Sequence, residues 1–192
     1  MNALWYVSRG TGVIALVLLT LVVVLGVLTR NGRPIPGVPR FVTLGLHRNA
    51  SLLALFLVVI HVATIISDSY AKVGWLDAVV PFLSDFRSLW IGLGTISLEL
   101  FVAVIGTSLV RGLLGRRTWR FVHWLVYAAW PIALAHGLGS GRDAGRPWML
   151  AMSALCIASA SVAIGYRIER ARHRPELVEI AHPARHLEVG VR

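Results

Sequence analysis

The sequence is poor in the residues on which soluble domains and cysteine-based sites depend. Its single cysteine, Cys156, excludes an internal disulfide framework and a cysteine-ligated metal cluster. Charged residues make up only 15% of the chain, and nine Asp and Glu stand against nineteen Lys and Arg. Hydrophobic residues instead reach 56%, above the ~45–50% of a typical soluble domain. This composition predicts a membrane protein.

Five apolar stretches are long enough to cross a bilayer, which needs roughly 20 residues for a hydrocarbon core of about 30 Å. The first lacks the basic start and the small-residue cleavage site of a signal peptide, so we interpret it as a span. We therefore predict an all-α integral membrane protein, a bundle of five transmembrane helices. The stretches are Gly12–Leu28 with Leu4–Thr11 before it, Ala50–Ile66 extended by Leu44–Asn49, Trp90–Val110, Phe121–Leu138 and Trp148–Tyr166.

The chain divides into a transmembrane domain over residues 1–167 and a basic tail over residues 168–192. The tail has no apolar period, and we expect it to be mobile and cytoplasmic. The connection Ser67–Leu89 is long and mixes aromatic and aliphatic residues with acids. We expect this connection to lie on or dip into the outer membrane interface as a short amphipathic helix.

The basic residues sort by connection. Fourteen arginines fall in the first connection, the third connection and the tail, whereas the second and fourth connections hold four basic residues. The positive-inside rule then predicts a multi-pass protein of the cell (plasma) membrane with its amino terminus outside and its carboxyl terminus in the cytoplasm. Because orientation accounts for the formal charge of +10, we predict a lipid bilayer as surroundings and no nucleic-acid partner.

Two of the predicted spans each carry two histidines, and ionisable residues inside a membrane are functional candidates. Fourteen residues separate His47 from His61, which is about 21 Å along a helix and within roughly 40° of one face. Thirteen residues separate His123 from His136, about 20 Å, and an ideal helix would place these two rings roughly 140° apart. Pro131 lies between them, so a kink or local rewinding there would realign their faces.

The second and fourth spans run in the same direction because one hairpin separates them. His47 and His123 then share a level near the cytoplasmic side, and His61 and His136 share a level near the outer side. Two neutral imidazoles facing each other across an iron suit a six-coordinate b-type haem for electron transfer. We therefore predict two haem b groups, with all four histidines as ligands of haem iron. Zinc is disfavoured, since its ligands gather around one ion.

Other interpretations of these histidines stay open. Each could be a structural residue bonded to a nearby carbonyl, or the set could form a metal or proton pathway. A transporter or channel with structural histidines is a further alternative, and it would show discontinuous helices around a central binding site.

Three stretches carry a resemblance to a known family. They are Trp5-Tyr6-Val7-Ser8-Arg9-Gly10-Thr11-Gly12, Trp119-Arg120-Phe121-Val122-His123-Trp124 and His136-Gly137-Leu138-Gly139-Ser140-Gly141-Arg142-Asp143. With the two histidine spacings, they resemble the ferric reductase-like transmembrane domain, and within it stand-alone actinobacterial members. The superfamily includes the membrane part of NADPH oxidases and the haem-binding subunit of bacterial methionine sulfoxide reductase systems. The similarity covers roughly Leu4 to Arg167, with five spans where the family usually has six.

The resemblance implies that His47, His61, His123 and His136 are haem ligands. It also implies electron transfer from a cytoplasmic-side donor to an extracytoplasmic acceptor such as ferric iron, oxygen or a partner reductase. The 25 residues after Arg167 are too few for a flavin and nicotinamide module, so we expect a flavoprotein or a quinol as donor. The alternative is a haem-binding anchor or relay subunit of a multi-component oxidoreductase, without a substrate site of its own. We assign no catalytic residue.

Three arginines are candidates for binding the haem propionates, which are anions at the membrane edges. Arg9 belongs to the outer level and Arg48 and Arg120 to the inner level, although each could instead be a snorkelling side chain. Glu99 lies near the middle of the third span. We expect it to be a proton or quinone contact, or a structural acid bonded to Thr95 or Ser97.

Four further acids fall in the predicted outer connections, and we expect them to be solvated, with the collection of a ferric chelate or the steering of a partner as the alternative. They are Asp68, Asp77, Asp85 and Asp143.

Overall fold

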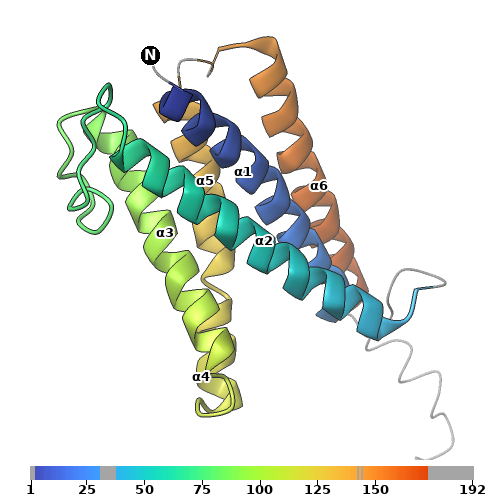
Figure 1. The fold of residues 1–192 in the computed structure, drawn as a ribbon. Coiled ribbons are helices and arrows are strands. Elements are labelled where there is room, and N and C mark those ends of the chain that lie inside the picture. The colour runs from blue at the N-terminus through green and yellow to red at the C-terminus, as the bar shows by residue number, and fades with distance from the viewer. Residues whose placement is uncertain (1–2, 31–37, 142, 144, 173–192) are drawn as a thin grey trace, which may run out of the picture.

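The structure is a computed structural model that describes residues 3–30, 38–141, 143 and 145–172. These residues form helices and connections without a strand. Five segments are long and apolar enough to cross a membrane when α4 and α5 are counted as one, which confirms the predicted five-span bundle (Figure 1). The helices are α1 (Ala3–Arg30), α2 (Arg40–Ile66), α3 (Ser88–Leu109), α4 (Arg116–His123), α5 (Val126–Ser140) and α6 (Pro147–Arg172).

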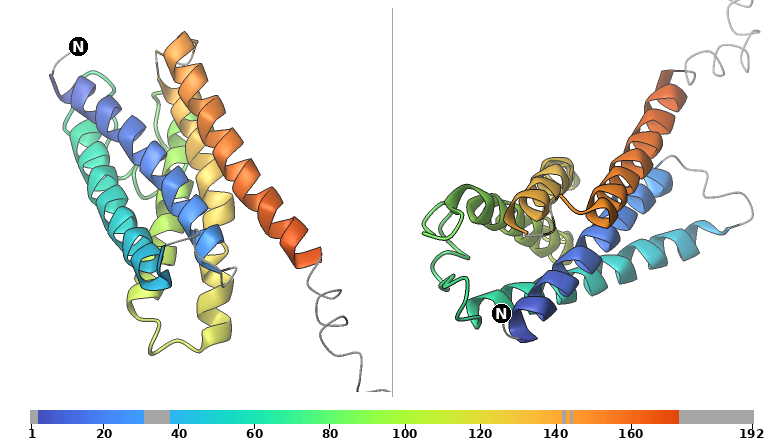
Figure 2. Two further views of the ribbon diagram at one scale, coloured as in Figure 1. Left: turned by 90° about the vertical axis from the view of Figure 1, so that its right-hand side faces the viewer. Right: turned by 90° about the horizontal axis from the view of Figure 1, so that it is seen from above.

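Helix α1 is the central element of the bundle. It packs against α2, α5 and α6, while α3 packs against α4 and α5 (Figure 2). The buried face of α1 carries small and aliphatic side chains such as Ala15, Val23 and Val27. The outer faces of the other helices expose large apolar residues, among them Phe56 and Val162. An apolar outer surface is what a bilayer requires, because lipid tails solvate such side chains.

The predicted fourth span is not one straight helix. It is divided into α4 and α5 by a turn at Trp124 and Leu125. Backbone bonds there run to the third preceding residue, from Leu125 N to Val122 O at 3.0 Å and from Ala128 N to Leu125 O at 3.0 Å. Such tight turns rotate the chain by about 120° per residue instead of 100°. Local rewinding between the two histidines is therefore present at Trp124 and Leu125, while Pro131 lies inside α5.

The connection between α2 and α3 contains turns rather than the predicted short helix. Its Ala71 and Val73 are buried against Trp5 of α1, so apolar packing replaces helical hydrogen bonding. The segment also folds back onto α3, where Thr95 Oγ1 donates to Asp77 O at 2.6 Å. The expected amphipathic helix is therefore absent from residues 67–87, although the segment does dip back along the bundle.

Helix α6 continues through Arg172, five residues beyond the expected end of the transmembrane domain. The remainder of the predicted tail, residues 173–192 with His173, His182 and His186, lies outside the described residues.

Candidate functional site

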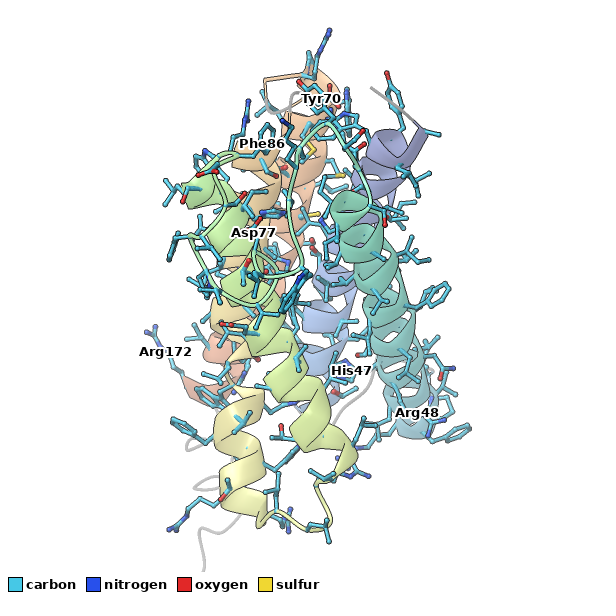
Figure 3. The ribbon with its side chains drawn as sticks, turned by 60° about the vertical axis from the view of Figure 1, so that its left-hand side comes forward. His47, Arg48, Tyr70, Asp77, Phe86 and Arg172 are labelled. Carbon is cyan, nitrogen blue, oxygen red and sulfur yellow. The ribbon has the colours of Figure 1, made fainter. Side chains whose placement is uncertain are left out.

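The four histidines of the spans meet in two facing pairs. The ring centroids of His47 and His123 are 6.4 Å apart at an interplanar angle of 59°. Those of His61 and His136 are 6.1 Å apart at 79°. We call His61 and His136 the upper pair and His47 and His123 the lower pair; Figure 3 labels His47 on the lower part of α2. The expected sharing of levels is thus what the structure contains.

The separations within both pairs match the space that one metal ion needs. A bond between a metal and an imidazole nitrogen is about 2.0–2.1 Å and the ring centre lies roughly 1 Å beyond, so two rings on one ion have centres about 6 Å apart. The part of the chain that the structure describes contains no group of three or more His, Cys, Asp and Glu suited to a metal. Two imidazoles per level suit an ion that brings its remaining ligands with it, as iron in a porphyrin does.

Backbone carbonyls of neighbouring helices orient the upper pair. His61 Nδ1 lies 2.7 Å from Ser8 O and 3.2 Å from Ser8 Oγ. His136 Nδ1 lies 2.7 Å from Trp90 O. Because a carbonyl oxygen only accepts, Nδ1 of each ring carries the proton and donates it. Nε2 is then the unprotonated nitrogen with a lone pair available to a metal, the usual arrangement of a ligand histidine.

The lower pair is oriented by one carbonyl and one hydroxyl. His47 Nδ1 donates to Val22 O at 3.1 Å. His123 Nδ1 lies 3.5 Å from Ser108 Oγ, which also accepts from Trp119 Nε1 at 3.3 Å. The Trp119 ring lies over His123, with centroids 5.1 Å apart at 31°. Side chains therefore take over part of the orienting role that the backbone has at the upper pair.

A cavity surrounds the upper pair. Its volume is about 190 Å³, it is partly open to the surroundings, and both rings of the pair line it. Its wall is mainly apolar, with Leu16, Leu98 and Phe101 among the lining residues. A large planar ligand with an apolar body would find suitable surroundings there.

Of the three arginines predicted to bind propionates, Arg9 lines this cavity. Its guanidinium forms an ion pair with Asp143, and the two side chains are 23% and 32% exposed. It also lies over the Trp5 ring, 5.8 Å from the centroid. Arg48 and Arg120 are exposed, as Figure 3 shows for Arg48 on the outer side of α2. A propionate-binding role stays a prediction for all three.

The expectation that Thr95 or Ser97 bonds Glu99 was wrong: Thr95 donates to Asp77 O, and Ser97 donates to Gly94 O at 3.0 Å. Glu99 is exposed on α3. A proton or quinone contact at Glu99 stays a prediction.

The acids of the connections are not all solvated, contrary to the expectation. Asp68 is buried at 2% exposure, and Asp143 is held by Arg9.

Sequence reasoning missed the residues that hold the imidazoles. It also missed a lower cluster in which Arg167 Nη1 donates to Tyr127 Oη at 2.7 Å and lies over the Trp124 ring at 5.5 Å. Every residue has a backbone carbonyl, so the side chains of Ser8, Val22 and Trp90 do not indicate that their carbonyls bind a histidine.

The comparison with known families is decisive for the class of this protein. The family model for ferric reductase-like transmembrane components matches residues 11–134, well over half of the chain. The chain belongs to this family. Family membership indicates electron transfer across a membrane, and ferric reductase-like domains generally bind haem. The match includes His47, His61 and His123, and it ends two residues before His136. No curated protein and no solved structure matches the chain.

Proposed function

We propose that this ferric reductase-like chain binds two b-type haems and conducts electrons between them across the membrane. One haem would lie between His47 and His123, and the other between His61 and His136. Electrons would enter from a cytoplasmic donor, a flavoprotein or a quinol, at the lower pair. They would leave from the upper pair to an extracytoplasmic acceptor such as ferric iron or a partner reductase.

One observation carries the proposal: both pairs have the separation that a single bis-imidazole iron requires. Centroid distances of 6.4 and 6.1 Å agree with the ring–metal–ring sum. Two unrelated structural histidines would have no reason to face each other at this distance at either level. Haem iron with two imidazole ligands is six-coordinate and supplies one-electron redox chemistry.

The residues of the chain have three tasks in this function. The imidazoles hold iron through Nε2 while Nδ1 stays bonded to a fixed partner, which sets ring orientation and ligand basicity. Apolar residues of the bundle exclude water and keep the local dielectric constant low. Arg9 offers a cation beside the upper cavity, where an anionic propionate needs one.

The vertical spacing of the levels supports conduction. Helix α2 is continuous from Arg40 to Ile66 and carries both His47 and His61, so the two levels are about 21 Å apart along its axis. This spans much of a hydrocarbon core of about 30 Å. The proposed direction follows the excess of arginines at the lower end, which the positive-inside rule assigns to the cytoplasm.

The test is the absorption spectrum and haem content of the purified protein. We expect two haems per chain, with low-spin b-type bands after reduction and two components in a redox titration. A protein without haem, or with high-spin haem only, would overturn the proposal. Reconstitution in liposomes with a reductant outside and ferric chelate inside, and then the reverse, checks conduction across the bilayer.

A further inference from the structure

A repeated feature of the helix backbone surrounds the histidines. We infer that a glycine placed four residues after each histidine-binding carbonyl is what lets the imidazole reach that carbonyl. This inference rests on the proposed haem ligation and names its positioning residues. They are Gly12, Gly26 and Gly94, with Ser108 in the corresponding place at the fourth histidine.

Each of the three glycines lies directly against a histidine ring, so a methyl group there would collide with the ring or crowd it. A contact under 3.0 Å requires something to move, and the neighbour here is a rigid ring rather than the end of a flexible side chain. From an ideal Cβ position, the nearest ring atoms are His61 Nδ1 at 2.8 Å for Gly12, His136 Nδ1 at 2.6 Å for Gly94 and His47 Cε1 at 3.3 Å for Gly26.

The three glycines bear the same relation to the carbonyls. Nδ1 of the upper histidines bonds the carbonyls of Ser8 and Trp90, and Nδ1 of His47 bonds that of Val22. The glycine always follows its carbonyl by four residues. In an α-helix this spacing joins the carbonyl of residue i to the N–H of residue i+4, so the glycine N–H occupies one lone pair of the oxygen. The histidine takes the other lone pair.

The helix geometry explains why this position must be small. The Cα–Cβ bond points toward the amino end of a helix, so the side chain at i+4 covers the backbone one turn before it. Ser and Thr at i+4 use this placement to bond the i carbonyl. Any side chain at that position occupies the space through which an imidazole approaches, and only glycine leaves it open.

The fourth histidine shows what happens when the position is not glycine. Ser108 follows Val104 by four residues, and its hydroxyl donates to Val104 O at 2.7 Å. His123 Nδ1 lies 3.5 Å from this hydroxyl. The serine thus fills the space that glycine leaves open elsewhere and links imidazole and carbonyl through its oxygen.

The spacing along the helices connects this arrangement to the two levels. Gly12 and Gly26 are fourteen residues apart on α1, as are Gly94 and Ser108 on α3. The two histidines of α2 have the same separation. Because α1 and α2 are antiparallel neighbours, the first glycine meets the second histidine and the second glycine meets the first. The glycines therefore follow the ligand spacing, which ordinary helix packing does not require.

The first experiment compares Gly94→Ala with Gly106→Ala on the same helix, where a Cβ would meet nothing within 4 Å. Both purified variants are measured for haem content, reduced-minus-oxidised spectrum and redox titration. We expect Gly94→Ala to lose the upper haem, one of the two titrating components, and Gly106→Ala to keep both unchanged. Gly12→Ala and Gly10→Ala form the equivalent pair on α1.

The second experiment enlarges the space instead of filling it. Ser108→Gly opens the Val104 carbonyl to His123, and a stronger acceptor at Nδ1 makes the ligand more basic and lowers the haem potential. We expect the redox component of the haem at the lower pair to shift to a more negative potential in Ser108→Gly. Ser108→Ala, which removes the hydroxyl and keeps the Cβ, should shift it the opposite way.

The outcomes separate this inference from the proposed function. A wild-type protein without haem would overturn both. Wild-type protein with two haems and a Gly94→Ala variant indistinguishable from Gly106→Ala would overturn the inference and leave the proposed function standing. Equal shifts in Ser108→Gly and Ser108→Ala would also contradict it, because hydroxyl loss alone would then account for the change.

Discussion

The upper and lower histidine pairs have nearly the same ring separation, yet different parts of the chain hold them. At the upper pair, two backbone carbonyls lie 2.7 Å from the Nδ1 atoms. At the lower pair, the carbonyl of Val22 is 3.1 Å away and the second partner is the Ser108 hydroxyl at 3.5 Å. A backbone acceptor is the same whatever the residue type, whereas a hydroxyl is lost by one substitution. A side-chain substitution can therefore remove a hydrogen bond that orients an imidazole at the lower pair, whereas the carbonyl acceptors of the upper pair remain.

The largest expected difference between the levels comes from removing one ligand. His61→Ala should abolish only the upper haem and His47→Ala only the lower haem, because each ring belongs to one pair. Haem content should fall to about half of the wild-type value in both variants. Redox titration identifies the surviving component, and each variant is the control for the other. Loss of the same component in both would contradict the assignment of two separate levels.

The charges beside the upper cavity should act on one component with opposite signs. A cation stabilises the reduced haem and raises its potential, so Arg9→Gln should lower the upper potential and Asp143→Asn should raise it. A single charge of this kind contributes on the order of 1 kcal/mol, or about 40 mV for one electron. Arg146→Gln, at an exposed arginine near the same end, is the control and should have a smaller effect. Shifts of equal sign would count against the proposed role of Arg9.

The lower pair can be adjusted through Trp119. Trp119→Phe keeps an aromatic ring beside His123 and removes the N–H that donates to Ser108 Oγ. We expect the spectrum of the lower component alone to change, with a loss of about 0.5–1.5 kcal/mol in the free energy of unfolding. Trp75→Phe, at a 68% exposed tryptophan of the α2–α3 connection, should change neither component. Electron paramagnetic resonance of the oxidised protein distinguishes the two haems.

Substitutions in the region between the two levels should have the smallest effect on the difference between the two haems. Thr20 Oγ1 accepts from Trp130 Nε1 at 2.9 Å and joins α1 to α5. Thr20→Val leaves the indole N–H without this acceptor, at a cost of about 1–3 kcal/mol. The thermal unfolding midpoint should fall while both haem potentials change little. Thr107→Val is the control, because Thr107 donates to the carbonyls of Ala103 and Val104 in its own helix.

The sequence was sufficient to predict the spans and the levels of the histidines, because the rise per residue of a helix is fixed. The separations of His47 from His61 and of His123 from His136 therefore translate directly into depth. Rotation about a helix axis is less predictable, since a few tight turns change it. The need to distort the fourth span followed from the 140° mismatch. The position of the distortion at Trp124 depends on local backbone hydrogen bonds, which the residue types there do not indicate.

The direction of Glu99 and the identity of the carbonyl partners had to come from the structure. Which face of α3 is turned outward depends on how that helix packs against α4 and α5. The glycines were visible but carried no assigned meaning. Their spacing of fourteen on α1, equal to that of the histidines on α2, was the available signal.

The equal spacing on three helices also restricts how this protein can change in length. One residue inserted into α1 between Gly12 and Gly26 would rotate the rest of that helix by about 100° and advance it by about 1.5 Å. One of the two glycines would then face the wrong neighbour, and a compensating insertion in α2 would move His47 or His61 away from the histidine that it faces on α4 or α5. Insertions and deletions should therefore be tolerated in the connections and rejected between the two levels. A scan of single-residue insertions should give protein that folds and binds haem when the insertion lies in a connection, and not when it lies between the two levels.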